Sequence, residues 1–346
     1  MSAAVISIEE HRIEQVLPHG AASAESKAAL QQLGCALKQH AYEFTTVTPL
    51  THRRVNARAT AGWAHDLPGI FGWSRPFKAA APGPELLALM RNAGVVEGGP
   101  GTLRANLRAS TLGSQLYFHS AYPTNAADAV FFGPDTYRFI RAMRASLLTL
   151  DRQDRAGRPI RRAADIGCGA GPGAVTIALA YPGAEVFAAD INPAALVLAE
   201  VNAAIAGAHN VTPVNSNLLN GVAGEFDLIV SNPPYLIDHE QRAYRHGGGN
   251  LGAGLSIAVV DEAIKRLAPG GTLMLYTGVA MVASADPFRM AVEPRLRAAG
   301  FLWSYEEIDP DVFGEELDEL AYGFTDRIAA VWLCATKPAT ESGSAG

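Results

Sequence analysis

The sequence predicts an α/β protein in which a doubly wound, mostly parallel sheet follows a smaller, mainly helical N-terminal domain. Strands, glycine turns and helices alternate repeatedly after residue 162. Before that point, segments 24–42 and 84–93 carry apolar residues at helical spacing and are separated by Pro- and Gly-rich stretches. Strands that alternate with helices of this length form parallel βαβ units with helices on both faces of the sheet.

The composition indicates a globular, cytoplasmic protein. Hydrophobic residues make up 49% and charged residues 18% of the 346 positions, so disorder is expected only at the ends. No stretch reaches the roughly 18 apolar residues that cross a bilayer, and the N-terminus does not have the pattern of a signal peptide. The three cysteines and nine histidines lack metal-ligand or disulfide spacing. We therefore expect neither a membrane partner nor a bound metal.

The first 125 residues are expected to form a tail over 1–22 and a substrate-recognition domain over 23–125. Within the latter, segment 102–122 turns to alternating and aromatic residues, which predicts one or two strands. Helices followed by a β element are compatible with a winged-helix-like unit. Segments 51–58 and 155–162 are basic, and each is interpreted first as a solvated face or linker, although either could contact nucleic acid.

The second domain is expected over 126–338, ahead of a disordered tail at 339–346. It begins with a short apolar run, a turn at Gly133-Pro134-Asp135 and a helix. The strands then expected are "AADIG", "AEVFAAD", "FDLIVSN" and "GTLMLYTGV", and the helices between them are "GAVTIALAYP", "NPAALVLAEVNAAIAG" and "LSIAVVDEAIKRLAP". Two further strands without a long helix between them predict an antiparallel pair at one edge of the sheet.

A ligand site is expected where the first strands of this sheet end. In an open sheet the ligand lies beyond the carboxyl ends of the strands, at the change in strand order. The first strand ends at Asp165 and runs into a turn with Gly167, Gly169 and Gly171, where glycines let backbone approach a ligand. Asp190 ends the second strand, where an acid can accept hydrogen bonds from both hydroxyls of a ribose. A glycine-rich turn alone would also suit a dinucleotide enzyme or a tight structural turn.

The position of Asp165 argues against a dinucleotide. A carboxylate just before the glycine turn would repel a pyrophosphate, whereas it could bind an ammonium group. A ligand that combines adenosine with an amino acid therefore fits better, and an oxidoreductase that uses NAD is disfavoured.

The segment "FDLIVSNPPYLID" follows an apolar strand with an amide, two prolines and an aromatic ring. Prolines fix φ and lack an N–H, so this loop is stiff and presents carbonyl groups rather than donors. By itself it could be an ordinary turn at the end of a strand.

Together, "ADIGCGAGPG", "VFAADINPAAL" and "FDLIVSNPPYL" resemble the motifs of class I S-adenosylmethionine-dependent methyltransferases, which have a Rossmann-like fold. They are most similar to the group that methylates planar nitrogens and includes the release-factor glutamine methyltransferases. The resemblance implies that Asp165 faces the methionine amino group of the cofactor and that Asp190 binds its ribose. It implies further cofactor contacts from six residues: Gly167, Gly169, Gly171, Ile191, Asn217 and Asn232. Asn217 stands where the family often has an acid, and its carbonyl can still accept from the adenine amine.

The resemblance also assigns the chemistry to Asn232-Pro233-Pro234-Tyr235. The side-chain oxygen of Asn232 and the backbone carbonyl of Pro233 would accept the two N–H hydrogens of a planar nitrogen, and Tyr235 would stack on the flat group. The expected activity is methylation of such a nitrogen, first of a glutamine in a protein of the translation-factor or ribosomal-protein type. An adenine or guanine amine in RNA or DNA, or a small molecule, remains open. A non-catalytic binding protein on the same fold is the alternative of another class.

Aromatic residues outside the motifs have two interpretations each. Phe131, Phe132 and Tyr137 could wall the cofactor pocket or pack in the core. The glycine-rich segment 244–256 could be a loop over the substrate, contacting it through Tyr244 and His246, or a surface loop.

Overall fold

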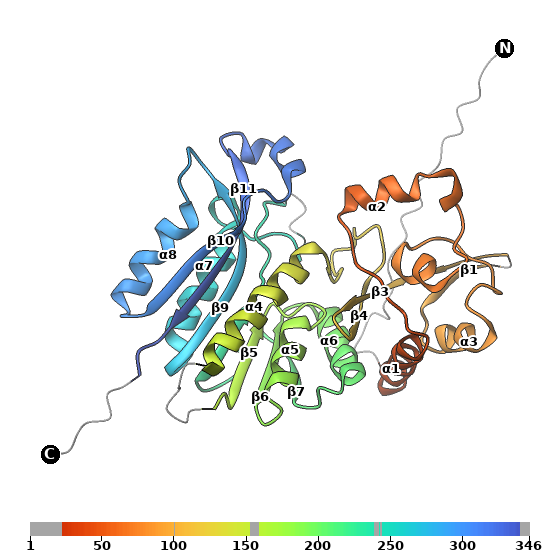
Figure 1. Cartoon of the computed structure of the whole chain (residues 1–346), viewed down its shortest axis with the longest axis horizontal. Helices are drawn as coiled ribbons and strands as arrows, with labels where there is room; N and C mark the ends of the chain where they lie inside the picture. Colours follow the sequence, from red (N-terminus) through yellow and green to blue (C-terminus); the bar gives the residue numbers. More distant parts are fainter. Residues whose placement is uncertain (1–22, 100, 153–158, 239–241, 243, 340–346) are drawn as a thin grey trace, which may run out of the picture.

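The computed structural model describes residues 23–99, 101–152, 159–238, 242 and 244–339. The expected N-terminal tail, most of the expected C-terminal tail and part of the basic segment 155–162 lie outside these residues. Figure 1 shows the sheet and its helices on one side of the molecule and the N-terminal helices and hairpins on the other, next to α6. No helix among the described residues is long and apolar enough to cross a membrane.

A seven-stranded sheet forms the larger part of the protein, in the order β10-β11-β9-β8-β5-β6-β7. The strands β5 to β9 run parallel, whereas β11 is antiparallel to both of its neighbours. The strands are β5 (Arg162–Ile166), β6 (Glu185–Asp190), β7 (Val211–Asn215), β8 (Phe226–Ser231), β9 (Leu267–Met281), β10 (Leu302–Asp309) and β11 (Arg327–Thr336). This arrangement confirms the doubly wound sheet and the antiparallel pair at one edge.

Helices cover both faces of the sheet because successive strand residues point to opposite faces. Ala163 faces one hydrophobic core and Ala164 faces the other. The first core contains side chains of α4 (Pro134–Arg152), α5 (Pro172–Ala180) and α6 (Pro193–Ala206), and the second contains those of α7 (Gly254–Arg266) and α8 (Pro287–Ala298).

Two of these elements were not expected from the sequence. The strand β7 contains Pro213 and has a polar pattern, neither of which is typical of a strand inside a sheet. Pro213 is tolerated because β7 lies at the edge of the sheet, where the missing backbone N–H removes no hydrogen bond between interior strands. The helix α8 contains Pro294, which interrupts the helical pattern in the sequence.

The N-terminal part combines helices with two antiparallel hairpins. Its elements are α1 (Ala24–Gln39), α2 (Pro49–Asn56), α3 (Pro84–Asn92), β1 (Val96–Gly99), β2 (Thr102–Ala105), β3 (Leu107–Leu112) and β4 (Gln115–Ser120), with short helical turns η1 (Ala59–Ala61) and η2 (Pro68–Gly72). Most of the basic segment 51–58 forms α2, with Arg53 exposed and His52 buried. The expected domain boundaries and the winged-helix-like interpretation stay predictions.

The N-terminal part shares the first core with the sheet. Leu33 of α1 and Phe118 of β4 are fully buried in that core together with Ile205 of α6. Gly34 approaches Ile205 so closely that an added Cβ would lie 2.2 Å from Ile205 Cδ1, so the two helices cannot separate or shift without losing this contact. The N-terminal part is therefore held against α6.

Strand pairing brings the predicted site residues to one edge. Ile166 at the end of β5 pairs with Ala189 of β6 on one side and with Ser231 of β8 on the other. The chain proceeds from β5 to β6 and β7 in one direction, then returns to β8 on the other side of β5. The switch in strand order therefore lies at β5, where ligands bind in sheets of this kind.

Candidate active site

The turn after β5 leaves open space where side chains would otherwise project. Gly167 and Gly169 have φ of 67° and 52°, a left-handed conformation that favours glycine. A Cβ added to Gly167 would meet no protein atom within 4 Å, and one added to Gly169 would meet only the Phe131 carbonyl at 4.0 Å. Both residues line a cavity at the switch point. A larger side chain at either position would occupy that cavity.

Gly171 has a different role from the one expected. It is left-handed as well, with φ of 82°, but it is not among the residues that line the cavity. A Cβ there would lie 3.1 Å from the Cα of Ala199 in α6. Gly171 therefore permits the close approach of α5 to α6, which the order of glycines in the sequence could not reveal.

Asp165 places a buried carboxylate in the cavity wall. Its Oδ2 accepts a hydrogen bond of 2.8 Å from the backbone N–H of Ala174, in the first turn of α5. Burial, opposed by the hydrogen bond from Ala174 and assisted by the nearby carboxylate of Asp190, raises the pKa of Asp165 to about 7. A cation in the cavity would favour the ionised form of Asp165.

Asp190 is held by backbone groups at the end of β6. Oδ2 accepts from the N–H of Gly169 and Oδ1 accepts from the N–H of Asn192, each at 2.9 Å. Burial raises the pKa of Asp190. A carboxylate oxygen has more than one acceptor site, so both oxygens can still accept from a ligand. Asp190 thus faces the cavity in an orientation that the glycine turn fixes.

Two further expected residues border the same cavity. Ile191 is 55% exposed although it is a large apolar residue, and it lines the cavity next to Asp190. Asn217, after β7, also lines the cavity and is exposed. Together they offer an apolar surface and an amide on the side of the cavity away from Asn232.

The Asn-Pro-Pro segment joins this cavity to a second, smaller one. Asn232, Pro233 and Pro234 line both. The segment leaves β8 directly beside the glycine turn, because Ser231 pairs with Ile166 and its hydroxyl donates to the Ile166 carbonyl at 2.7 Å. Asn232 and Pro233 therefore lie where a group in the smaller cavity could approach a ligand in the larger one.

Tyr235 is anchored more firmly than the sequence indicated. It lines the smaller cavity but is only 7% exposed, and its ring packs on Gly278, where an added Cβ would lie 2.2 Å from Cε2. Phe313 meets the ring edge to face, with centroids 5.9 Å apart. The Tyr235 hydroxyl donates to the carboxylate of Asp135. Stacking of Tyr235 on a substrate stays a prediction.

Asp135 is a site residue that the sequence did not indicate. It lies in the first turn of α4, almost fully buried, and it also accepts from the Tyr276 hydroxyl at 2.8 Å and from Arg138 at 3.0 Å. Burial raises the pKa of Asp135, while these donors and the charge of Arg138 oppose the rise. The partners lie far from Asp135 along the chain, and the sequence signalled only a turn at this position.

Aromatic residues form the wall that the two cavities share. Phe131 and Tyr244 line both, and their rings stack with centroids 6.3 Å apart. The Tyr244 hydroxyl donates to the Thr124 carbonyl at 2.6 Å. By contrast, Phe132 packs in the core, and the Tyr137 hydroxyl accepts from the N–H of Thr46 at 3.0 Å. Of the three aromatic residues near residue 131, only Phe131 therefore meets the pocket expectation.

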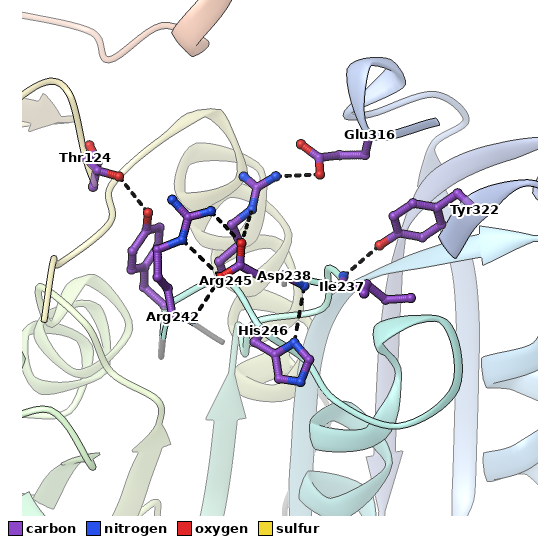
Figure 2. A network of polar contacts seen from close by, with 9 residues as sticks. Thr124, Ile237, Asp238, Arg242, Arg245, His246, Glu316 and Tyr322 are labelled. Carbon is purple, nitrogen blue, oxygen red and sulfur yellow. Dashed lines mark hydrogen bonds and ion pairs between the residues drawn. The ribbon is translucent and has the colours of Figure 1, made fainter. Parts of the chain in front are cut away.

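The segment that follows the motif is held by polar contacts (Figure 2). Asp238 pairs with Arg242 and Arg245, and Arg245 also pairs with Glu316. The hydrogen bonds from Arg242 hold the pKa of Asp238 below its usual range. His246 accepts from the backbone N–H of Asp238 through Nδ1 at 3.2 Å and lines neither cavity. For His246 the structure thus shows a contact within the segment, and a contact with a substrate stays a prediction.

Comparison with known proteins finds similarity to methyltransferases. Residues 144–283 match the family model of the methyltransferase small domain. The release factor glutamine methyltransferase of Deinococcus radiodurans is 37% identical over 180 residues, which cover 49% of this chain and 60% of that protein. The protein of the same name from Bradyrhizobium diazoefficiens is 35% identical over 185 residues, covering 49% and 59%. A solved methyltransferase structure from Pyrococcus furiosus has a TM-score of 0.36 at 20% identity, covering 55% of this chain and 82% of that one.

The chain thus spans little more than half the length of these curated relatives. The family match over residues 144–283 includes the glycine turn and the Asn-Pro-Pro segment. The resemblance predicted from the motifs is confirmed: this chain is similar to class I S-adenosylmethionine-dependent methyltransferases, and among them to the small-domain group that includes the release factor glutamine methyltransferases.

Proposed function

We propose that this protein is an S-adenosylmethionine-dependent N-methyltransferase that methylates the side-chain amide of a glutamine in a protein. The observation that carries the proposal is the position of Asn232 and Pro233, which line the cavity bordered by Asp165 and Asp190 as well as the smaller cavity next to it. A methyl donor in the first cavity and a planar nitrogen in the second would meet at this segment.

The first cavity fits the three parts of the proposed cofactor. Asp165 would bind the ammonium group, Asp190 would accept from the ribose hydroxyls, and Ile191 and Asn217 would border the adenine. The open space beside Gly167 supports the fit, because a side chain there would fill part of the site. When bound, the cofactor supplies an activated methyl group.

Asn232 and Pro233 would prepare the nitrogen for methylation. An amide nitrogen is a poor nucleophile because its lone pair is delocalised into the neighbouring π system. Two acceptors that take both N–H hydrogens orient that lone pair and become stronger partners as positive charge develops on nitrogen. Pro233 and Pro234 restrict the loop so that little reorganisation is needed. Phe131 and Tyr244 in the shared wall would exclude water.

A protein substrate is favoured over nucleic acid by charge and by similarity. The formal net charge is −6, which opposes binding of a polyanion. The relatives reported above are named as methyltransferases of release factors. A translation-factor substrate is therefore part of this proposal, and methylation of an RNA or DNA base is the competing outcome.

The test is transfer of a labelled methyl group from S-adenosylmethionine into an extract of cells that lack this protein. Parallel samples are digested with protease or with nuclease, and the Asn232→Ala variant serves as the inactive control. Label that protease releases and nuclease leaves intact supports the proposal. Label that only nuclease releases would replace the protein substrate with nucleic acid. No label with wild type in any fraction would argue for a binding protein without turnover.

A further inference from the structure

A third cavity, of about 500 Å³, adjoins the proposed substrate side of the site. It lies between the N-terminal part and the segment around Phe313. Phe131, Tyr244 and Phe313 line both this cavity and the smaller cavity that holds Asn232. A molecule with its reacting nitrogen near Asn232 could therefore extend into the third cavity.

Arg108, in β3, is a buried cation in the wall of this cavity. Its side chain is part of the lining although the residue is only 4% exposed. Nε donates to the Gly72 carbonyl at 3.0 Å, whereas Nη2 is buried and has no hydrogen-bond partner among the described residues. Burial lowers the pKa of Arg108 to about 10, and no carboxylate among the described residues forms an ion pair with it. A buried guanidinium in such surroundings lacks the counter-ion that normally accompanies it.

His52 supplies a second buried donor, whose Nδ1 makes no hydrogen bond of normal geometry among the described residues, although the Trp73 carbonyl interacts with the ring. Arg75 Nε donates to Asn56 Oδ1 at 2.9 Å, and this contact fixes the orientation of the Asn56 amide. Asn56 Nδ2 then donates to His52 Nε2 at 3.0 Å, so the proton of the neutral ring is on Nδ1. That Nδ1 is buried and has no hydrogen-bond partner of normal geometry among the residues that the structure describes. Burial and the charge of Arg108 lower the pKa of His52 to about 4, so the ring is neutral near pH 7.

The other arginines of the cavity differ from Arg108. Arg138 pairs with Asp135 and Asp309, Arg242 pairs with Asp238, and Arg245 pairs with Asp238 and Glu316. Arg53 also lines the cavity but is exposed, so water can solvate it. Buried donors in native proteins are almost always satisfied. Three buried donors in the lining of this cavity have no hydrogen bond among the described residues: Arg108 Nη2, His52 Nδ1 and Arg245 Nε. Arg245 Nε lies 3.4 Å from a carboxylate oxygen of Asp238, whereas no ion pair is formed by Arg108 or His52 within the described part of the chain, so these two donors call for a ligand. A carboxylate supplies the charge and the acceptor sites that Arg108 and His52 lack.

We propose that Arg108 and His52 form a subsite for a carboxylate of the substrate peptide, that is, an acidic residue near the methylated glutamine. The identification of the ligand as a substrate peptide rests on the proposed function. The binding of a carboxylate at Arg108 and His52 does not depend on it. A peptide is favoured over nucleic acid because the protein carries a formal net charge of −6, which opposes binding of a run of phosphates. Among the described residues that line the cavity, Arg108 is the buried arginine without an ion pair, and one carboxylate would match its charge.

The first experiment titrates sodium acetate into the full-length protein, with sodium chloride at equal ionic strength as the reference. The readout is the NMR signal of the His52 Cε1–H, which Arg108→Gln leaves in place. We expect a saturable shift in wild type and in Arg53→Gln, the matched control that removes an exposed charge from the same cavity. In Arg108→Gln we expect the apparent affinity for acetate to fall about tenfold or more, because a charge-assisted hydrogen bond is lost. Equal shifts in all three proteins, or none in wild type, would overturn the subsite.

Thermal unfolding separates lost binding from lost folding. Without acetate, Arg108→Gln should unfold at the same temperature as wild type or higher, because a buried charge without a counter-ion is removed. If Arg108→Gln does not fold, the acetate titration of wild type still tests the subsite, because the absence of a saturable shift of the His52 signal would overturn it. A clear loss of stability in acetate-free buffer would indicate that Arg108 is structural and would contradict the proposal.

The second experiment uses peptides with one glutamine and one glutamate placed at different distances from it. With Arg108→Gln, KM for the preferred peptide should rise about tenfold or more while kcat changes little. For a peptide without glutamate, KM should be equal in wild type and variant. Acetate binding without methyl transfer would refute the proposed function and leave the subsite standing. If inorganic phosphate and a single-stranded RNA bind at least as tightly as acetate and shift the same His52 signal, the peptide carboxylate is wrong.

Discussion

The hydroxyl of Tyr235 connects the Asn-Pro-Pro segment to a buried carboxylate, and its removal tests how far catalysis depends on that support. Tyr235→Phe deletes the donor to Asp135 and leaves the ring in place against Gly278 and Phe313. We expect both a loss of stability and a loss of turnover, since Tyr235 follows directly on the residues that would orient the nitrogen.

The expected stability change follows from the contact that is lost. A hydrogen bond to an ionised group contributes about 1.5–3 kcal/mol. Asp135 keeps its hydrogen bonds from Tyr276 and Arg138 in the variant, so the lower end of that range applies. About 1.5 kcal/mol corresponds to a decrease of roughly 3–6 °C in the unfolding temperature for a domain of this size. Differential scanning calorimetry of the ligand-free protein measures it.

The expected decrease in kcat has a separate cause from the loss of stability, namely the displacement of the residues that position the nitrogen. A displacement of about 1 Å in a positioning element can lower the rate about a hundredfold. Tyr235→Phe should therefore lower kcat by about ten- to a hundredfold. Tyr276→Phe is the matched control, because it removes the other tyrosine donor to Asp135 from β9, outside the motif. We expect it to lose similar stability and to retain kcat within about threefold of wild type. Equal kcat in the two variants would refute a positioning role for the Tyr235 hydroxyl.

Three further predictions concern the proposed cofactor and substrate sites. Asn232→Ala should abolish methyl transfer while calorimetric titration still detects S-adenosylmethionine binding; retained turnover would defeat the mechanism. Asp190→Ala should weaken cofactor binding by about 1.5–3 kcal/mol, roughly ten- to a hundredfold in Kd, through lost hydrogen bonds to a charged group. Because the pKa of Asp165 is about 7 in the ligand-free protein, its carboxylate is increasingly protonated below that pH, and cofactor affinity should fall as the pH decreases from about 7.5 to about 5.5. Titrations across this range should show no such fall in Asp165→Asn, and an equal pH dependence in the variant would contradict the assignment.

The same raised pKa has a consequence for folding, with the opposite direction in pH. The folded protein binds a proton at Asp165 more tightly than the unfolded chain does, so the contribution of Asp165 to stability is greatest below the unfolded pKa. That contribution decreases as the pH rises toward about 7. The contribution of Asp165 to the stability of the folded protein is thus smallest in the pH range in which its carboxylate is ionised and can bind an ammonium group.

The sequence predicted the part of the site that depends on strand order alone. Asp165 and Asp190 lie in the last residues of their strands and Asn232 directly follows its strand, and the carboxyl ends of parallel strands share one edge. Their convergence therefore required only the correct sheet. β7 escaped prediction because Pro213 weakens its strand pattern, although an edge position makes that proline harmless.

The support around the motif could not be predicted in the same way. Asp135 lies 100 residues from Tyr235 and 141 from Tyr276, and no local pattern marks which buried carboxylate will accept from which hydroxyl. In the sequence, Arg108 does not differ from the other arginines of the chain. Its distinguishing features are visible in the structure alone: the residue is buried, and its Nη2 has no hydrogen-bond acceptor among the described residues. Such features depend on tertiary packing, which periodicity does not encode.

Asn202 of α6 indicates how the N-terminal part is coupled to the cofactor side. Its fully buried amide accepts from the N–H of Phe118 at 2.8 Å and donates to the Phe118 carbonyl at 3.0 Å, and it also donates to the Ala170 carbonyl at 2.9 Å. One side chain thus joins β4, which pairs with the strand of Arg108, to the glycine turn. Because buried amide groups are costly to leave unpaired, neither partner can move without the other. The proposed carboxylate subsite and the proposed cofactor site therefore lie on elements joined by direct contacts, as a reaction that requires exact alignment of two ligands demands.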